Sequence, residues 1–156
     1  MAILQKTSIY LLLLSLLTIG CKKDNDDIQQ TDIEIPIVSE LPVMYYGCYL
    51  TNGQNVVVED QIGFDTVFNQ NIVSPVPSLQ NFDFSKYNIL AGAEVYTHGV
   101  FKLEHSFIMS PNSEYIYTVK VYYDLTHQAG IFYYGVVIDK LPSNAIIKFE
   151  VIKFNE

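Results

Sequence analysis

Residues 115–138 read YIYTVKVYYDLTHQAGIFYYGVVI, and this stretch predicts the fold more strongly than any other. Residues 115–123 alternate large apolar side chains with polar ones, which is the pattern of a strand with one buried face. The polar segment 124–130 predicts a turn, because Asp, Gln and Gly lie there between two apolar runs. Residues 131–138 are apolar throughout, which is typical of a central strand covered on both faces.

Shorter segments on either side extend this pattern. Residues 101–109 and 147–151 alternate in the same way, and in the first of these the odd positions, from Phe101 to Met109, should face the core. Residues 87–93 predict a short apolar strand. The chain therefore contains enough strand-forming segments for a sheet of several strands.

The segments before residue 87 are less regular. Phe64, Val67 and Phe68 have the spacing of one helical face, so a single short helix is expected there. Residues 71–82 contain two prolines and predict an extended surface loop, whereas residues 35–58, with TNGQN in the middle, predict a hairpin. The fold class that follows is mainly β, a β-rich α+β domain over 35–156, built as an antiparallel sheet or small sandwich with one short helix.

Composition limits the possible functions. The chain has 156 residues, which is enough for one ordinary domain and excludes a multidomain enzyme. It has 9 basic residues against 17 acidic ones, and every basic residue is a lysine. Because no arginine is present to form bidentate contacts with phosphates or base edges, nucleic acid is not an expected partner.

The first segment reads as an export signal. Lys6 precedes an apolar run over residues 9–20, which is too short to span a bilayer and is typical of a secretory signal peptide over 1–20. The run ends in LTIGC, residues 17–21, which resembles the lipobox of bacterial lipoproteins. Lipidation of Cys21 would anchor the chain to a membrane. The alternative is an ordinary cleaved signal followed by an incidental cysteine.

Residues 21–34 follow as an acidic, flexible tether with five acids and no aromatic residue. Position 22 is Lys and not the Asp of the known inner-membrane retention signal, so the expected location is the cell envelope, at the outer membrane. The acid cluster is similar to the export signal of surface-displayed lipoproteins, and the alternative is a spacer that holds the domain off the bilayer.

Reactive chemistry is not predicted. With Cys21 lipidated, Cys48 has no disulfide partner, and its apolar neighbours predict a buried, unreactive thiol. His98, His105 and His127 are too scattered to indicate a metal site or a catalytic base, and no nucleotide, hydrolase or zinc motif occurs. We therefore expect a protein that is not an enzyme and that has no metal and no cofactor. Residues 83–86 (DFSK) are expected to form a turn that leads into a strand.

Two short motifs carry a family resemblance. DFSK at residues 83–86 and KLP at residues 140–142, with the order of elements around them, make residues 56–152 similar to the PrcB-like C-terminal domain family of small bacterial envelope lipoproteins. The type member of that family stabilises a surface protease. The resemblance implies that this chain docks on another envelope protein and has no catalytic residues.

The surplus of tyrosine, 12 residues, predicts a recognition surface. Tyr122 and Tyr123 are adjacent, as are Tyr133 and Tyr134, so one of each pair must point to the opposite face of the sheet. We expect one face to expose tyrosines, or else to be covered by the helix and the 71–82 loop. Two functions remain: a lipid-anchored protein-protein interaction module, or a ligand-binding lipoprotein that holds a glycan or another small molecule through exposed tyrosines.

Overall fold

A computed structural model describes residues 31–155. The predicted signal peptide, Cys21 and most of the predicted tether lie outside these residues. The order of elements is β1 (Ile33–Glu34), β2 (Ile37–Glu40), β3 (Asn55–Val58), α2 (Gln61–Val67), α3 (Gln70–Val73), the 3-10 turn η1 (Pro77–Leu79), β4 (Tyr87–Met109), β5 (Tyr115–Asp139) and β6 (Ile147–Asn155). None of the helices in the described part of the chain is long and apolar enough to cross a membrane.

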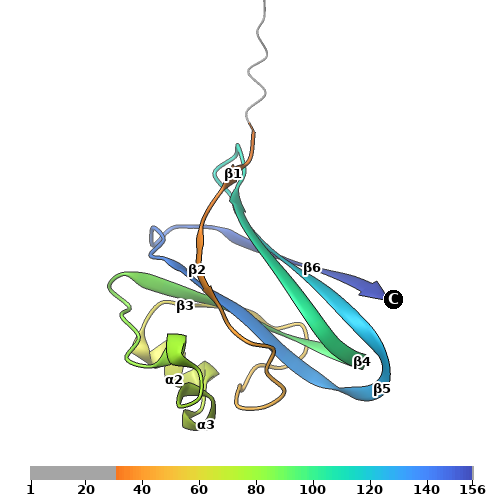
Figure 1. Cartoon of the computed structure of the whole chain (residues 1–156). Coiled ribbons are helices and arrows are strands. Elements are labelled where there is room, and N and C mark those ends of the chain that lie inside the picture. The colour runs from red at the N-terminus through yellow and green to blue at the C-terminus, as the bar shows by residue number, and fades with distance from the viewer. Residues whose placement is uncertain (1–30, 156) are drawn as a thin grey trace, which may run out of the picture.

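The molecule is built on one long hairpin (Figure 1). β4 has 23 residues and β5 has 25, and they pair antiparallel from Tyr87 opposite Asp139 to Met109 opposite Tyr115. The chain reverses at residues 110–114, where Ser113 has a positive φ of 62° and its amide donates to Ser110 O at 2.9 Å. This confirms a β-rich α+β fold, with far longer strands than the separate segments predicted from the sequence.

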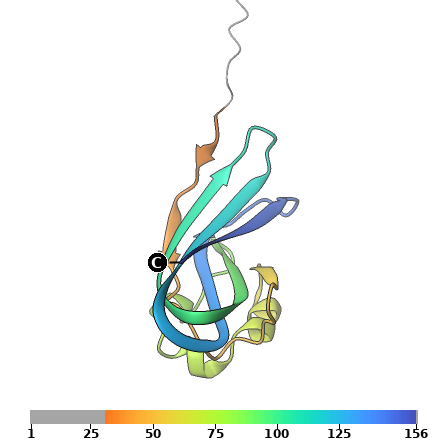
Figure 2. The ribbon, with the colours of Figure 1, turned by 90° about the vertical axis from the view of Figure 1, so that its right-hand side faces the viewer.

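The turn predicted at residues 124–130 is wrong, because this segment continues β5 and pairs with β4 around His98. The register shifts at Tyr96, His98 and Val100, so both strands bend sharply without breaking (Figure 2). Gly99 allows the close approach, since a Cβ there would lie 2.5 Å from Thr126 Oγ1. The polar composition of 124–130 therefore reflects solvent exposure on the outside of a bend and not a chain reversal.

The bend divides the hairpin into two halves that pack face to face. The covered half comprises residues 87–96 of β4 with residues 130–139 of β5, and the open half comprises residues 100–109 of β4 with residues 115–123 of β5. Buried side chains from both halves form the inner core between them, and the ring centres of Tyr117 and Tyr134 lie 6.4 Å apart across it. One sheet thus supplies both layers of the molecule.

A second core lies on the outer face of the covered half, beneath the helices. α2 buries Phe64 and Val67, as predicted, and begins at Asp60, whose carboxylate accepts a hydrogen bond from Gly63 N at 2.7 Å. The extended loop predicted for residues 71–82 is wrong, because α3 and η1 form there. Their buried apolar residues, with the linker between them, are Ile72, Val76 and Leu79. The two prolines therefore limit this segment to short helical turns, but they do not prevent helical structure.

Short strands complete the sheet at its edges. β1 pairs with the open half and β2 with the covered half, so the N-terminal segment joins the two halves along one side. The hairpin predicted over 35–58 is wrong, since β2 pairs with β5 and β3 pairs with β4. Pairing also begins at Ile33, within the predicted tether. β6 runs parallel to β5, which makes the six-stranded sheet mixed.

Candidate binding surface

The four tyrosines predicted to form a recognition face are separated by the fold. Tyr123 and Tyr134 are buried in the inner core. Tyr133 is half-buried on the outer face of the covered half, where its backbone pairs with Met44. Only Tyr122 lies on the outer face of the open half. Within each adjacent pair the two side chains point to opposite faces of the sheet, as predicted. The four tyrosines nevertheless do not form an exposed face.

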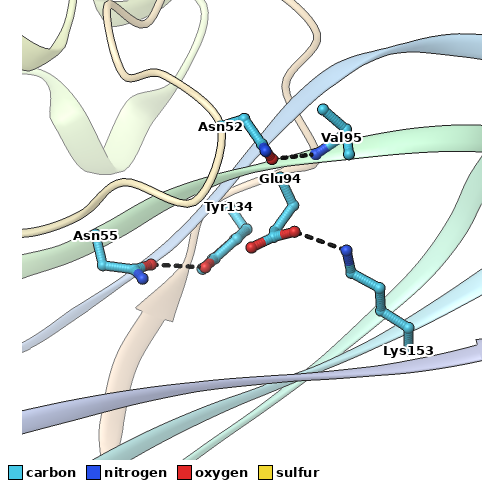
Figure 3. Close-up of polar contacts among 6 residues, drawn as sticks. All are labelled: Asn52, Asn55, Glu94, Val95, Tyr134 and Lys153. Carbon is cyan, nitrogen blue, oxygen red and sulfur yellow. Dashed lines mark hydrogen bonds and ion pairs between the residues drawn. The ribbon is translucent and has the colours of Figure 1, made fainter.

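Tyr134 is buried because it has a hydrogen-bond partner inside the sheet. Its hydroxyl donates to Asn55 Oδ1 at 2.7 Å, and its ring lies against Gly92, where a Cβ would be only 2.4 Å from the hydroxyl (Figure 3). Burial raises the pKa of Tyr134 above its ordinary value. The nearby Glu94 carboxylate pairs with Lys153 Nζ at 2.7 Å, which ties β6 to the covered half. These residues stabilise the interior and are not available to a partner.

Three aromatic rings instead cross the outer face of the open half, one from each of β4, β5 and β6. We call Phe101, Tyr122 and Phe154 the aromatic strip. The rings of Tyr122 and Phe154 stack at 5.0 Å between centres with 12° between planes, and Phe101 meets Tyr122 edge-on at 6.2 Å. Phe101 is 50% exposed and Phe154 is 39% exposed. Large apolar rings in contact with water and with one another are typical of an interaction surface.

Phe101 was predicted to face the core, and this prediction is wrong. The register shift between Val100 and Lys102 turns Phe101 outward, while Leu103, His105 and Phe107 keep the inward face. A bulge of this kind leaves no mark on the alternating pattern of a single strand, so the sequence alone could not locate it. Phe154 could have been found, because it continues the alternation of residues 147–151 on the outward side.

Charged groups hold Tyr122 in place within the strip. Its hydroxyl donates to Glu104 Oε2 at 2.9 Å, and Lys102 Nζ lies 5.3 Å from the centre of its ring. Lys102 also pairs with Glu104 at 2.6 Å, and this hydrogen bond is the main cause that lowers the pKa of Glu104. The central ring of the strip is therefore oriented before any partner binds.

The strip ends at an uncovered sheet edge. Among the described strands β6 pairs only with β5, so the other side of its nine-residue backbone is unpaired. Ile152 lies on the same outward face and is 41% exposed. The edge lysines are engaged within the chain, Lys148 with Glu150 and Lys153 with Glu94. Such an edge can accept an added strand from another protein.

A second exposed aromatic group lies on the loop after β2, and sequence reasoning missed it. Tyr45, Tyr46 and Tyr49 are 43%, 69% and 62% exposed. A cavity of about 330 Å³ lies beside two of them, lined mainly by apolar residues that include Pro42, Met44, Tyr45, Tyr46, Ile72 and Val76. Gly47, with φ of 86°, lets this loop pack on α3, since a Cβ there would be 2.8 Å from Ile72. Proline and glycine in this segment were the available signal for an irregular loop.

Three of the groups considered for chemistry have structural roles, namely His105, Cys48 and Asp83. His105 Nδ1 lies 2.8 Å from the Tyr117 hydroxyl, and burial lowers the pKa of His105 from 6.5 to about 4. Cys48 is a free, buried thiol, and burial raises its pKa to about 12, which makes it unreactive as predicted. Asp83 accepts hydrogen bonds from the backbone and hydroxyl of Ser85 and pairs with Lys86, which confirms the turn before β4.

Comparison of the chain with protein-family models, with curated proteins and with solved structures found no match.

Proposed function

We propose that this protein is a lipid-anchored, non-catalytic interaction module of the cell envelope, which docks on another envelope protein and stabilises it. The anchor is Cys21, the tether keeps the domain clear of the bilayer, and the docking surface is the aromatic strip with the adjoining edge of β6. The resemblance to the PrcB-like C-terminal domain family supports the same role. The proposed location is the outer membrane.

One observation carries this proposal. Within residues 31–155 only one of the two outer faces of the sheet is covered, because α2, α3 and the loop after β2 all pack on the covered half. The other outer face presents the aromatic strip directly beside an unpaired strand edge. A partner strand added to β6 would gain backbone hydrogen bonds and would place its side chains next to Ile152 and Phe154.

Charge indicates what kind of partner fits. The chain has a formal net charge of −8, so two copies repel each other and self-association through this face is disfavoured. A neutral or basic protein surface is favoured as the occupant. Lys102, beside the strip, is paired with the Glu104 carboxylate of its own strand.

The test compares two double variants of the full-length lipoprotein in its native host. Phe101→Ser with Phe154→Ser removes the two outer rings of the strip. Tyr46→Ser with Tyr49→Ser removes two aromatic rings that are still more exposed, from the other side of the domain. After crosslinking in intact cells, we expect one envelope protein to be captured by the wild type and by the control and to be lost from the strip variant. The abundance of that protein should fall in the strip variant only, since stabilisation is part of the proposal.

Capture that is equal in both double variants would show that the strip is not the docking surface. Both variants must first show unchanged thermal unfolding, which we expect because all four side chains are exposed. Binding of the purified partner to the purified lipoprotein, with the same loss in the strip variant, completes the test.

A second candidate function is favoured by the tyrosine-lined cavity. Its volume of about 330 Å³ is at the lower end of the range for small-molecule sites, and exposed Tyr46 could stack on a sugar ring. If this protein binds a glycan, oligosaccharides should raise its melting temperature, and Tyr46→Ala should remove that shift while Phe154→Ser does not. If no glycan shifts the melting temperature, docking is the one of these two functions that remains.

A further inference from the structure

The bend of the hairpin brings two histidines together. His98 of β4 and His127 of β5 are register partners, and their ring centres lie 5.2 Å apart with 51° between the planes. His98 is half-buried and His127 is exposed. The spacing of the histidines in the sequence argued against a metal site, but it could not show that residues 124–130 pair with β4. Because that segment is paired strand, the two imidazoles project from adjacent strands at one position.

The separation of the rings suits a shared metal ion. A zinc or copper ion binds an imidazole nitrogen at about 2.0–2.1 Å, which places it roughly 3.2 Å from the ring centre. Two ring centres at that distance, seen from the ion at a tetrahedral angle, would lie about 5.2 Å apart. The observed distance of 5.2 Å between the ring centres equals this separation.

One of the rings is already oriented by a neighbour. Thr97 Oγ1 lies 3.0 Å from His98 Nδ1, so this nitrogen has a hydrogen-bond partner and Nε2 is the one left to bind a ligand. Metal-binding histidines in proteins are regularly held in this way by a hydrogen bond at the other ring nitrogen. Thr97 would act as a positioning residue for the site.

The surrounding charge also favours a cation. The Asp124 carboxylate lies over Gly99, where a Cβ would be 2.7 Å from both of its oxygens, and the pKa of Asp124 is lowered mainly by hydrogen bonds from Thr126, with a smaller contribution from His98. The nearest cationic side chain lining the adjacent cavity is Lys153, which is neutralised by its ion pair with Glu94.

We propose that His98 and His127 form a binding site for a divalent transition-metal ion of the zinc and copper class. Within the described residues no group of three or more His, Cys, Asp or Glu side chains is placed to hold a metal, so two imidazoles are the protein ligands and water takes the remaining positions. The ion would link β4 to β5 at the bend and resist its opening. This site is independent of the docking surface.

The test is calorimetric titration of the full-length lipoprotein, purified in non-ionic detergent without a polyhistidine tag, with Zn²⁺ and separately with Cu²⁺ at pH 7.5. We expect one ion per chain, with Cu²⁺ bound more tightly than Zn²⁺ and Mg²⁺ not bound. His127→Ala and His98→Gln should each abolish measurable binding, and Thr97→Val should weaken it by about tenfold. Bound Cu²⁺ should show coupling to two nitrogens in its paramagnetic resonance spectrum.

A matched control separates this site from adventitious binding. His105→Gln removes the remaining histidine and should leave metal binding unchanged. Zn²⁺ should raise the melting temperature of the wild type and of the control, but not of His127→Ala. Binding that survives His127→Ala, or the absence of binding to the wild type, would overturn the proposal.

Discussion

At the scale of single residues, the buried pair of His105 and Tyr117 shows how the inner core tolerates a polar side chain. The imidazole stacks on the phenol ring with 9° between planes, and the Tyr117 hydroxyl can donate to Nδ1 of the neutral imidazole. A proton added to this ring would be a buried charge, which explains why burial is the cause of its lowered pKa. His105 is thus held in its neutral form.

This burial makes stability depend on pH. The pKa of His105 falls from 6.5 in the unfolded chain to about 4 in the folded one, so below pH 6.5 the unfolded state binds more protons than the folded state. The folded state keeps its full stability above pH 6.5 and loses stability as the pH falls. The loss in the free energy of unfolding amounts to about 3 kcal/mol once pH 4 is passed. Urea unfolding of the wild type and of His105→Gln at several pH values measures it.

We expect the wild type to lose more stability than His105→Gln between pH 6.5 and 4, since the variant has no group to protonate at that position. If the free energies of unfolding of the two proteins change in parallel between pH 6.5 and 4, His105 takes up its proton in the folded state without cost.

At the scale of elements, α2 depends on a single cap because it has only seven residues. Asp60→Ala removes the carboxylate that accepts from Gly63 N, and we expect the free energy of unfolding to fall by about 1 kcal/mol. Asp65→Ala on the same helix removes an equal charge and a surface hydrogen bond with Gln61, which should change stability by less than about 0.5 kcal/mol. Chemical denaturation of both variants measures the difference, and equal losses would show that the cap does not stabilise α2.

The elements also show where sequence reasoning succeeds. The period of two in β5 and β6 was predictable because alternate side chains of each strand face the inner core. Tyr117 and Val119 are buried there, and Val151 is partly buried. The helix at Phe64 was predictable for the same reason, since its buried side is encoded within a few residues. These features need only local information, and the sequence contains it.

What could not be predicted depends on contacts between distant segments. Pairing of His98 with His127 requires a bend whose bulges are set by Gly99 and by the packing of both halves. The outward turn of Phe101, and with it the aromatic strip, follows from the same register shift. Pairing of β2 with β5, and not with β3, is likewise a choice between partners that local alternation cannot make.

At the scale of the whole molecule, the proposed anchor and the proposed docking surface lie at different ends of the chain. The lipid would be attached at Cys21, ahead of β1, while the aromatic strip ends on the last strand. Cys21→Ser should therefore release the protein from membranes without changing its affinity for a soluble form of the partner. Sedimentation of cell membranes followed by detection of the protein measures the release. Unchanged partitioning would defeat the assignment of Cys21 as the anchor.

The long hairpin also determines the order in which the chain can fold. The turn at residues 110–114 joins two strands that are neighbours in sequence, so their pairing can extend outward from this point, whereas Ile37 pairs with Ile138 and must wait for almost the entire chain. β1 and β2 both precede their partner strands by most of the chain. We therefore expect the side that they form to close only after the long hairpin has paired, so that the earliest segment of the domain is the last to become ordered.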